Sequence, residues 1–214
     1  MHNTGMMKRG RFIVIDGIDG SGKGTQVELL KRALGKHTVF THEPGGTPKA
    51  EKIRKILLER KKETPAPLAD FLLFWAARAD HVERIILPAL RAGKNVITDR
   101  FDSSTFAFQI CAEQAPELKS LFEECRIAVL SKCIPDAYII LDMPAEKAMK
   151  WRRENPVKKA VFFDEKPLAY HKRARLGFKR FANIVSSKVF FVNANRTPEE
   201  VHEEILCIAS KQCH

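Results

Sequence analysis

The sequence predicts a three-layer α/β/α domain built around a central parallel sheet. Short apolar segments typical of buried parallel strands alternate with segments whose apolar residues follow helical spacing. A glycine-rich turn separates the first strand from the first helix, and 214 residues with 44% hydrophobic content are enough for one well-buried core. Strands that alternate with helices form βαβ units, whose parallel strands are covered by helices on both faces.

The expected elements follow one another along the whole chain. Strands are predicted at residues 11–16, 38–41, 95–99, 136–142 and 188–193. Helices are predicted at residues 25–34, 50–59, 68–90 and 198–210, with further helical patterns between the later strands. Pro88 is expected to bend the end of the third of these helices. We expect an N-terminal extension at residues 1–10 and a single domain at 11–214, with an irregular, lid-like segment at about 152–166.

Composition limits the partners and the compartment. The formal net charge of +11 suits nucleic acid, anionic lipid or phosphorylated small molecules, but the charge is spread along the chain without an arginine-rich tail. A solvated basic surface therefore stays open as the alternative, and nucleic acid is not expected as a partner. Five cysteines without a C-x-x-C pair indicate reduced thiols and a cytoplasmic location. No apolar run approaches the roughly 20 residues of a membrane span, and the run at 12–15 is too short for a signal peptide.

A phosphate-binding loop lies between the first strand and the first helix. Its glycines allow the backbone to curl around a phosphate, the helix N-terminus adds partial positive charge, and the lysine can reach the β- and γ-phosphates. A ligand-free glycine turn is the alternative, but it would not explain the placed lysine. The predicted ATP-binding residues of this loop are Gly17, Asp19, Gly20, Ser21, Gly22, Lys23, Gly24 and Thr25.

The residue after the lysine departs from the usual pattern of this loop. A serine or threonine is expected there to bind Mg²⁺, whereas this chain has Gly24 and places the hydroxyl at Thr25. This arrangement resembles the phosphate loop of adenylate kinases. Mg²⁺ is the predicted cofactor, with Thr25 and Asp99 as its candidate ligands and with water and nucleotide oxygens completing its coordination.

Four further segments specify the acceptor side of the site. They read THEPGGTP at 41–48, FWAARADHV at 74–82, DRFDSSTFAFQ at 99–109 and YHKRARLGF at 170–178. In order and spacing they resemble the motifs of the thymidylate kinase family, and the resemblance covers residues 12–204. It implies transfer of the γ-phosphoryl group of ATP to dTMP, a five-stranded sheet, dependence on Mg²⁺ and a homodimer packed through helices.

The resemblance also implies roles for individual residues. Arg100 would grip the acceptor phosphate and act in catalysis with Lys23 and Asp99, although a structural ion pair between Asp99 and Arg100 is the alternative. Phe74 would stack on the base and Arg78 would contact it, although Phe74 is flanked by apolar residues and could be a core aromatic. The remaining predicted acceptor-binding residues are Asp19, Glu43, Pro44, Thr105, Phe108 and Gln109. Phe108 replaces the usual tyrosine of the family, but its ring is still expected to disfavour a 2′-hydroxyl.

The source of catalytic positive charge differs from the family pattern. Arginine in the phosphate loop or lid usually supplies it, and this loop has none, so Arg153, alone or with Arg152, is predicted to bind the ATP phosphates. The later D-R-F-E pattern is not kept, because its arginine position corresponds to Phe162. A solvated helix end is the alternative for Arg153. Asn195 is predicted to border the adenine, in a segment that could equally be a helix cap with Thr197.

Two other functions stay open at this level. A kinase with the same machinery could act on dUMP, UMP, CMP or AMP, since Gly24, Phe108 and the altered lid depart from the family pattern. A non-catalytic nucleotide-binding or nucleic-acid-binding protein could also use this fold. Retention of donor and acceptor residues together argues against the second reading, because binding alone does not require Lys23, Asp99 and Arg100.

Overall fold

The protein has a five-stranded parallel sheet in the order β2-β3-β1-β4-β5. The structure is a computed structural model that describes residues 8–58, 66–155 and 166–213. The strands are β1 (Phe12–Gly17), β2 (Thr38–His42), β3 (Asn95–Asp99), β4 (Ala137–Asp142) and β5 (Lys188–Asn193). All four neighbouring pairs are parallel, which confirms the predicted sheet.

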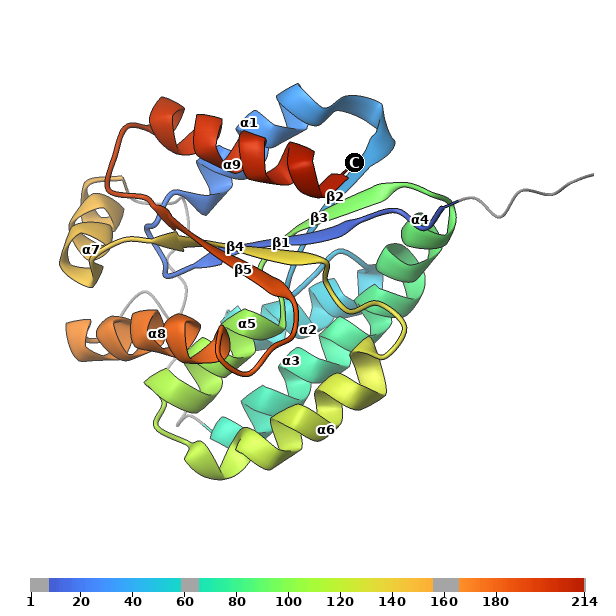
Figure 1. The fold of residues 1–214 in the computed structure, drawn as a ribbon. Helices are drawn as coiled ribbons and strands as arrows, with labels where there is room; N and C mark the ends of the chain where they lie inside the picture. The colour runs from blue at the N-terminus through green and yellow to red at the C-terminus, as the bar shows by residue number, and fades with distance from the viewer. Residues whose placement is uncertain (1–7, 59–65, 156–165, 214) are drawn as a thin grey trace, which may run out of the picture.

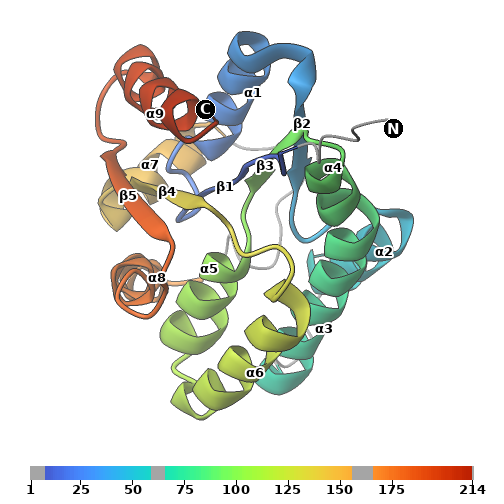
Figure 2. The ribbon, with the colours of Figure 1, turned by 45° about the vertical axis from the view of Figure 1, so that its right-hand side comes forward.

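Helices cover both faces of this sheet (Figure 1). One face carries α1 (Lys23–Leu34) and α9 (Pro198–Cys213), and the other carries the larger group around α3, α5, α6 and α8 (Figure 2). The helices of this group and its neighbours are α2 (Pro48–Leu58), α3 (Pro67–His81), α4 (Leu87–Arg91), α5 (Asp102–Thr105), α6 (Lys119–Leu130), α7 (Ala145–Glu154) and α8 (Leu168–Phe181). The chain also forms 3₁₀-helices η1 (Gly35–His37) and η4 (Pro116–Leu118) and π-helices η2 (Val82–Ile86) and η3 (Phe106–Ala112). Within the described residues no helix is both long and apolar enough to cross a bilayer.

The central strand β1 shows why the apolar segments form this architecture. Successive side chains of a strand point to opposite faces, and all four residues from Phe12 to Ile15 are fully buried. Phe12 and Val14 belong to the core under α3, α6 and α8, whereas Ile13 and Ile15 belong to the core under α1 and α9. A strand buried on both faces needs a continuous apolar run, and the sequence supplies one.

The long helix predicted at 68–90 is interrupted. The helical segments α3, η2 and α4 follow one another without a gap, but η2 is π-helical and separates the two α-helices. Pro88 lies in the first turn of α4, where it has no N–H to donate and its ring crowds the carbonyl four residues earlier. The wider π-turn accommodates this proline. The bend expected at Pro88 therefore takes the form of an altered helical turn just before it.

The strand order places two loops at one point on the carboxyl edge of the sheet. β1 lies between β3 and β4, and the connections that leave β1 and β3 run to opposite sides. Ligands bind in the crevice that such a reversal opens in α/β sheets. Residues that follow β1 and residues that follow β3 therefore meet there, although more than eighty positions separate them.

Candidate active site

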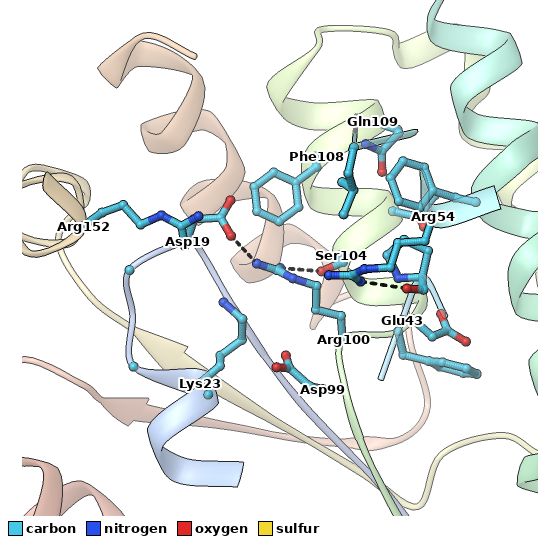
Figure 3. A pocket seen from close by; sticks show the side chains of 18 of the residues that line it. Asp19, Lys23, Glu43, Arg54, Asp99, Arg100, Ser104, Phe108, Gln109 and Arg152 are labelled. Carbon is cyan, nitrogen blue, oxygen red and sulfur yellow. Dashed lines mark hydrogen bonds and ion pairs between the residues drawn. The ribbon is translucent and has the colours of Figure 1, made fainter. Parts of the chain in front are cut away.

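A cavity of about 560 Å³ opens at this reversal point. Its volume lies within the range of small-molecule sites, roughly 300–1,000 Å³. Most residues predicted from the sequence line it, namely Asp19, Gly20, Gly22, Lys23, Gly24, Thr25, Glu43, Pro44, Phe74, Arg78, Asp99, Arg100, Thr105, Phe108 and Gln109. Figure 3 shows Arg100 between Asp19 on one side and Arg54 and Glu43 on the other.

Four predicted site residues do not line the cavity. Gly17 and Ser21 belong to the phosphate loop but lie behind its inner surface, with Ser21 buried. Arg153 lies on α7 outside the cavity. Asn195 follows β5, where its side-chain oxygen accepts a hydrogen bond from Lys147 Nζ at 3.0 Å. The neighbouring Thr197 caps α9, because its hydroxyl oxygen accepts from the Glu200 backbone N–H at 3.3 Å and its own backbone N–H donates to the Glu200 carboxylate at 2.9 Å. This segment therefore forms the cap that the sequence left as an alternative.

The phosphate loop has the backbone conformation that its glycines permit. Gly20 has φ +79°, and a Cβ there would lie 2.3 Å from the carbonyl oxygen of Ala148 at the start of α7. Gly22 has φ +90° and immediately precedes α1. The loop therefore curls tightly around the N-terminus of α1, which supplies unpaired N–H groups and positive dipole charge for an anion.

Lys23 points back into this loop. Its Nζ donates to the carbonyl oxygens of Gly17 at 3.0 Å and Ile18 at 2.8 Å. Burial, together with the charge of Arg100, lowers the pKa of Lys23 to about 8, and the nearby Asp19 and Asp99 carboxylates only partly oppose this. An incoming phosphate would offer the ammonium group a stronger partner than two neutral carbonyls.

Arg100 connects the loops that follow β1 and β3. It has φ +70°, a strained conformation for a non-glycine residue, and its backbone N–H donates to Ile15 at 2.9 Å. Its guanidinium group donates to Asp19 at 2.6 Å, to Ser104 at 2.9 Å and to the Gly17 carbonyl at 3.1 Å. The arginine predicted to bind the acceptor phosphate is thus held in advance at the rim of the phosphate loop.

Two carboxyl groups beside Arg100 respond differently to the same environment. Burial raises the pKa of Asp16 more than Arg100, Ser103 and Lys23 lower it. Burial also acts to raise the pKa of Asp19, but the positive charges of Arg100 and Lys23 outweigh it, so that pKa is lowered. Asp19 therefore presents a carboxylate at the cavity, while Asp16 supports the loop from behind.

The acceptor half of the cavity is built around a buried arginine. Arg78 is only 2% exposed, and its Nε donates to Glu43 at 2.8 Å while its Nη2 donates to Thr105 at 3.1 Å. Its Nη1 is also buried and has no hydrogen-bond partner in the described structure. A buried N–H group without a partner costs roughly 1–3 kcal/mol, so this nitrogen is suited to an acceptor atom of a ligand.

Two further arginines line the cavity: Arg54 was not expected there from the sequence, and Arg152 was expected only together with Arg153. Arg54 on α2 lines the cavity and donates to the Pro44 carbonyl at 2.7 Å, yet its sequence segment shows only an amphipathic helix. Arg152 lines the cavity in place of its neighbour Arg153. A signal for Arg152 exists in the sequence. Ala145 and Ala148 are the buried residues of α7, and Arg152 follows them with the i, i+3, i+7 spacing of one helix face.

Asp99 provides the feature that fits a divalent cation. Its Oδ1 is buried without a hydrogen-bond partner in the described structure, at the end of β3 opposite the phosphate loop. The described residues contain no cluster of three or more His, Cys, Asp or Glu side chains that would form a protein-only metal site. Mg²⁺ in phosphate sites typically takes one or two carboxylates together with phosphate oxygens and water, so a single carboxylate at this position suffices.

The similarity to known proteins agrees with this geometry. The sequence model of the thymidylate kinase family matches residues 15–205. The thymidylate kinase of Chlamydia caviae is 38% identical over 199 residues, which cover 91% of this chain and 95% of that protein. The chain belongs to the thymidylate kinase family. Members of the thymidylate kinase family are ATP-dependent nucleoside monophosphate kinases.

Other members of the family give the same result. The thymidylate kinase of Symbiobacterium thermophilum is 39% identical over 198 residues, covering 91% of this chain and 90% of that protein. The crystal structure of thymidylate kinase from Ehrlichia chaffeensis has a TM-score of 0.73 and 29% identity, and covers 94% of this chain and 98% of that one. The thymidylate kinase fold therefore extends over nearly the whole chain.

The low pKa of Lys23 leads to a testable prediction. In the free protein, an NMR titration of ¹³C-methylated lysines should show one resonance with a midpoint near pH 8 that is missing from Lys23→Met. Saturating ADP should raise this midpoint, because a bound phosphate favours the charged ammonium. A midpoint above pH 10 without nucleotide, or a fall on adding ADP, would contradict the prediction.

Proposed function

We propose that the protein transfers the γ-phosphoryl group of ATP to dTMP. The observation that carries this proposal is one cavity with a phosphate-binding loop at one end and the buried, partly unpaired Arg78 at the other. The first end fits the donor nucleotide, and the second fits a base of limited size. Membership of the thymidylate kinase family supports the same pair of substrates.

The acceptor end favours a pyrimidine that has a carbonyl group at the ring position where cytosine has its amino group. A guanidinium group can only donate hydrogen bonds, so the unpaired Nη1 of Arg78 needs an acceptor such as a carbonyl oxygen of thymine or uracil. Phe74 lines the same part of the cavity and offers a flat apolar surface, and stacking of a base on such a ring is worth ~1–3 kcal/mol. The amino group of cytosine would leave the arginine nitrogen without a partner.

Two further arginines are placed for the acceptor phosphate. Arg100 and Arg54 both line the cavity between the base end and the phosphate loop. The phenyl ring of Phe108 lies under the Arg100 guanidinium, at 5.3 Å from the ring centroid, and is positioned to contact the sugar. Asp19 lies at the opposite side of Arg100, where it can accept from a sugar hydroxyl.

The chemistry requires alignment more than covalent participation. An oxygen of the acceptor phosphate attacks the γ-phosphorus in line, the bond to the β-phosphate oxygen breaks, and ADP leaves. Lys23 and the N-terminus of α1 would stabilise the negative charge on the donor phosphates. Asp99 and Thr25 would hold Mg²⁺, directly or through water, and the bound cation would supply further charge neutralisation to those phosphates.

An assay with parallel acceptors tests the proposed substrate. ADP production with Mg-ATP should be fastest with dTMP when dTMP, dUMP, UMP, CMP and AMP are offered separately at equal concentration. Lys23→Met should reduce turnover by about a thousandfold, since it removes a cation from the transferring group. Fastest turnover on another monophosphate would overturn the acceptor assignment, and a wild-type protein inactive on all five would overturn the kinase assignment.

We also propose that α7 supplies catalytic positive charge to the site. The predicted lid at 152–166 falls largely outside the described residues, but its first residues lie at the C-terminal end of α7. Arg152 faces the cavity, and its charge contributes to lowering the pKa of Asp19 in the phosphate loop (Figure 3). Arg152, which the sequence named only together with Arg153, therefore lines the cavity beside the phosphate loop, whereas Arg153 does not line it.

The two adjacent arginines give a matched pair of variants. Arg152→Ala should lower kcat by about a hundredfold, because it removes a cation from the developing charge of the transition state. Arg153→Ala should stay within about threefold of the wild type. The opposite order would return the catalytic role to Arg153, and an unchanged kcat in both would exclude α7 as the source of this charge.

A homodimer and a cytoplasmic location complete the proposal. Large apolar side chains are exposed on the adjacent helices α3 and α6, with Leu72 46% and Ile127 72% exposed. Exposed apolar residues on two helices that contact each other suit a helix-to-helix interface. The five cysteines are all free thiols, as expected of a protein in a reducing compartment.

The mass in solution tests the dimer. Light scattering should give about twice the 24.3 kDa of one chain, and Ile127→Glu should shift this mass toward a single chain because it buries a charge in the interface. Leu176→Glu is the control, since Leu176 is 53% exposed on α8, away from α3 and α6. A monomeric wild type, or a dimer unaffected by Ile127→Glu, would contradict this interface.

A further inference from the structure

A chain of hydrogen bonds runs behind the acceptor end of the cavity. His81 Nε2 lies 2.6 Å from Thr41 Oγ1, and His81 Nδ1 lies 3.0 Å from Glu43 Oε1. The other oxygen of Glu43 accepts from Arg78 Nε at 2.8 Å. His81 is fully buried, and neither it nor Thr41 lines the cavity. These hydrogen bonds therefore connect Thr41 and His81, which do not line the cavity, to Arg78, which does.

The direction of each hydrogen bond follows from the chemistry of its partners. The Glu43 carboxylate that pairs with Arg78 can only accept, so the hydrogen facing it belongs to His81 Nδ1. In a neutral imidazole the other nitrogen is then an acceptor, and the Thr41 hydroxyl donates to it. Thr41 thus favours the tautomer in which His81 Nδ1 carries the hydrogen and donates it to Glu43.

The surrounding backbone leaves the imidazole little freedom. His81 ends α3 three residues after Arg78, so the two side chains lie on one face of the helix. Gly46 in the turn after Glu43 has φ +84°, and a Cβ there would lie 2.7 Å from His81 Nε2 and 2.8 Å from Thr41 Oγ1. The turn packs directly against the pair, which explains why glycine is needed at this position.

These contacts determine where Arg78 points. A guanidinium group is planar, so fixing Nε on Glu43 and Nη2 on Thr105 also fixes the direction of the unpaired Nη1. The orientation of Glu43 depends in turn on its second oxygen, which His81 holds. Loss of the His81 donor would leave that oxygen unsatisfied in a buried position and free the carboxylate to rotate.

We propose that His81 is a positioning residue for acceptor selection, which acts through Glu43 to aim the free N–H of Arg78 at a carbonyl group of the acceptor base. The inference rests on the proposed function, since the acceptor is taken to be a pyrimidine monophosphate. It assigns to His81 and Thr41 a part in distinguishing thymine from a base with an amino group at the same ring position.

Two substitutions separate a donor role from a packing role. His81→Leu keeps a similar volume but has no hydrogen-bond donor, whereas His81→Asn is smaller but keeps an N–H near the position of Nδ1. Steady-state kinetics would be measured with ATP, dTMP and 5-methyl-dCMP, which has an amino group in place of one thymine carbonyl. If His81 acts as a hydrogen-bond donor, His81→Leu should impair the kinetics with dTMP more than His81→Asn does. If His81 only fills space, the smaller asparagine of His81→Asn should impair them more.

The expected result for His81→Leu is a KM for dTMP raised about tenfold and a preference for dTMP over 5-methyl-dCMP reduced by a similar factor. The KM for ATP should stay within about twofold. His81→Asn should remain within about threefold of the wild type in all three quantities. His42→Ala is the control, because His42 is an exposed neighbour that pairs with Glu51 outside this chain of hydrogen bonds.

Several outcomes would overturn the inference. The first is a KM for dTMP in His81→Leu that stays within twofold of the wild type. The second is an equal rise in the KM for ATP, and the third is a larger rise in the KM for dTMP in His81→Asn than in His81→Leu. If His81→Leu does not fold, Thr41→Val decides, with about a threefold rise in the KM for dTMP expected and no change contradicting the proposal. A wild-type protein inactive on dTMP would instead overturn the proposed function itself.

Discussion

The contact of Arg100 with the phosphate loop is the interaction on which the rest of the site depends. Its guanidinium group reaches Asp16 and Asp19, and its backbone N–H pairs with β1, so the ends of β1 and β3 are held in one arrangement. The left-handed backbone of Arg100 costs ~1–3 kcal/mol, and the buried ion pairs offset that strain. Removing one partner from such a buried cluster costs ~3–5 kcal/mol, because the remaining carboxylates would be uncompensated. Arg100 thereby holds the phosphate loop in place and, in the proposed function, also binds the acceptor phosphate.

The basic charge of the chain is only partly explained by this site. Lysines and arginines number 37 in the sequence, and five of those in the described structure line the cavity. Those five face at least three carboxylates in the same cavity, those of Asp19, Glu43 and Asp99. The cavity is therefore a balanced array of charges with a small cationic excess, suited to phosphate groups. Most of the net charge of +11 lies elsewhere on the molecule.

The parts of the site that depend on local backbone chemistry can be predicted from the sequence. The phosphate loop was recognisable because its glycines, its lysine and its position between a strand and a helix are all sequence-adjacent. The central strands β1 and β4 can be recognised because a strand buried on both faces must be largely apolar, whereas the edge strands β2 and β5 are partly exposed and show only short apolar runs. Arg54 was missed because its reach to the cavity depends on how α2 packs against the turn at Pro44, which no local spacing encodes. Arg152 and Arg153 differ by about 100° around α7, and only the buried alanines distinguish the two faces. The π-turn before Pro88 was missed because it is a compromise between a proline and a continuous helix.

The position of β1 in the middle of the sheet has a consequence for how the protein folds. β1 is the first strand in the chain, yet its two neighbours are β3 and β4, whose residues begin at Asn95 and Ala137. During synthesis the four fully apolar residues of β1 have no strand partner until β3 has left the ribosome, and they have no partner on the other side until β4 follows. Pairings over such sequence distances are slow to form, because loop closure must precede any gain in contact energy. The phosphate loop, which directly follows β1, is therefore flanked by paired strands only after both β3 and β4 have been made, and a nascent chain that ends before β4 lacks a complete nucleotide site.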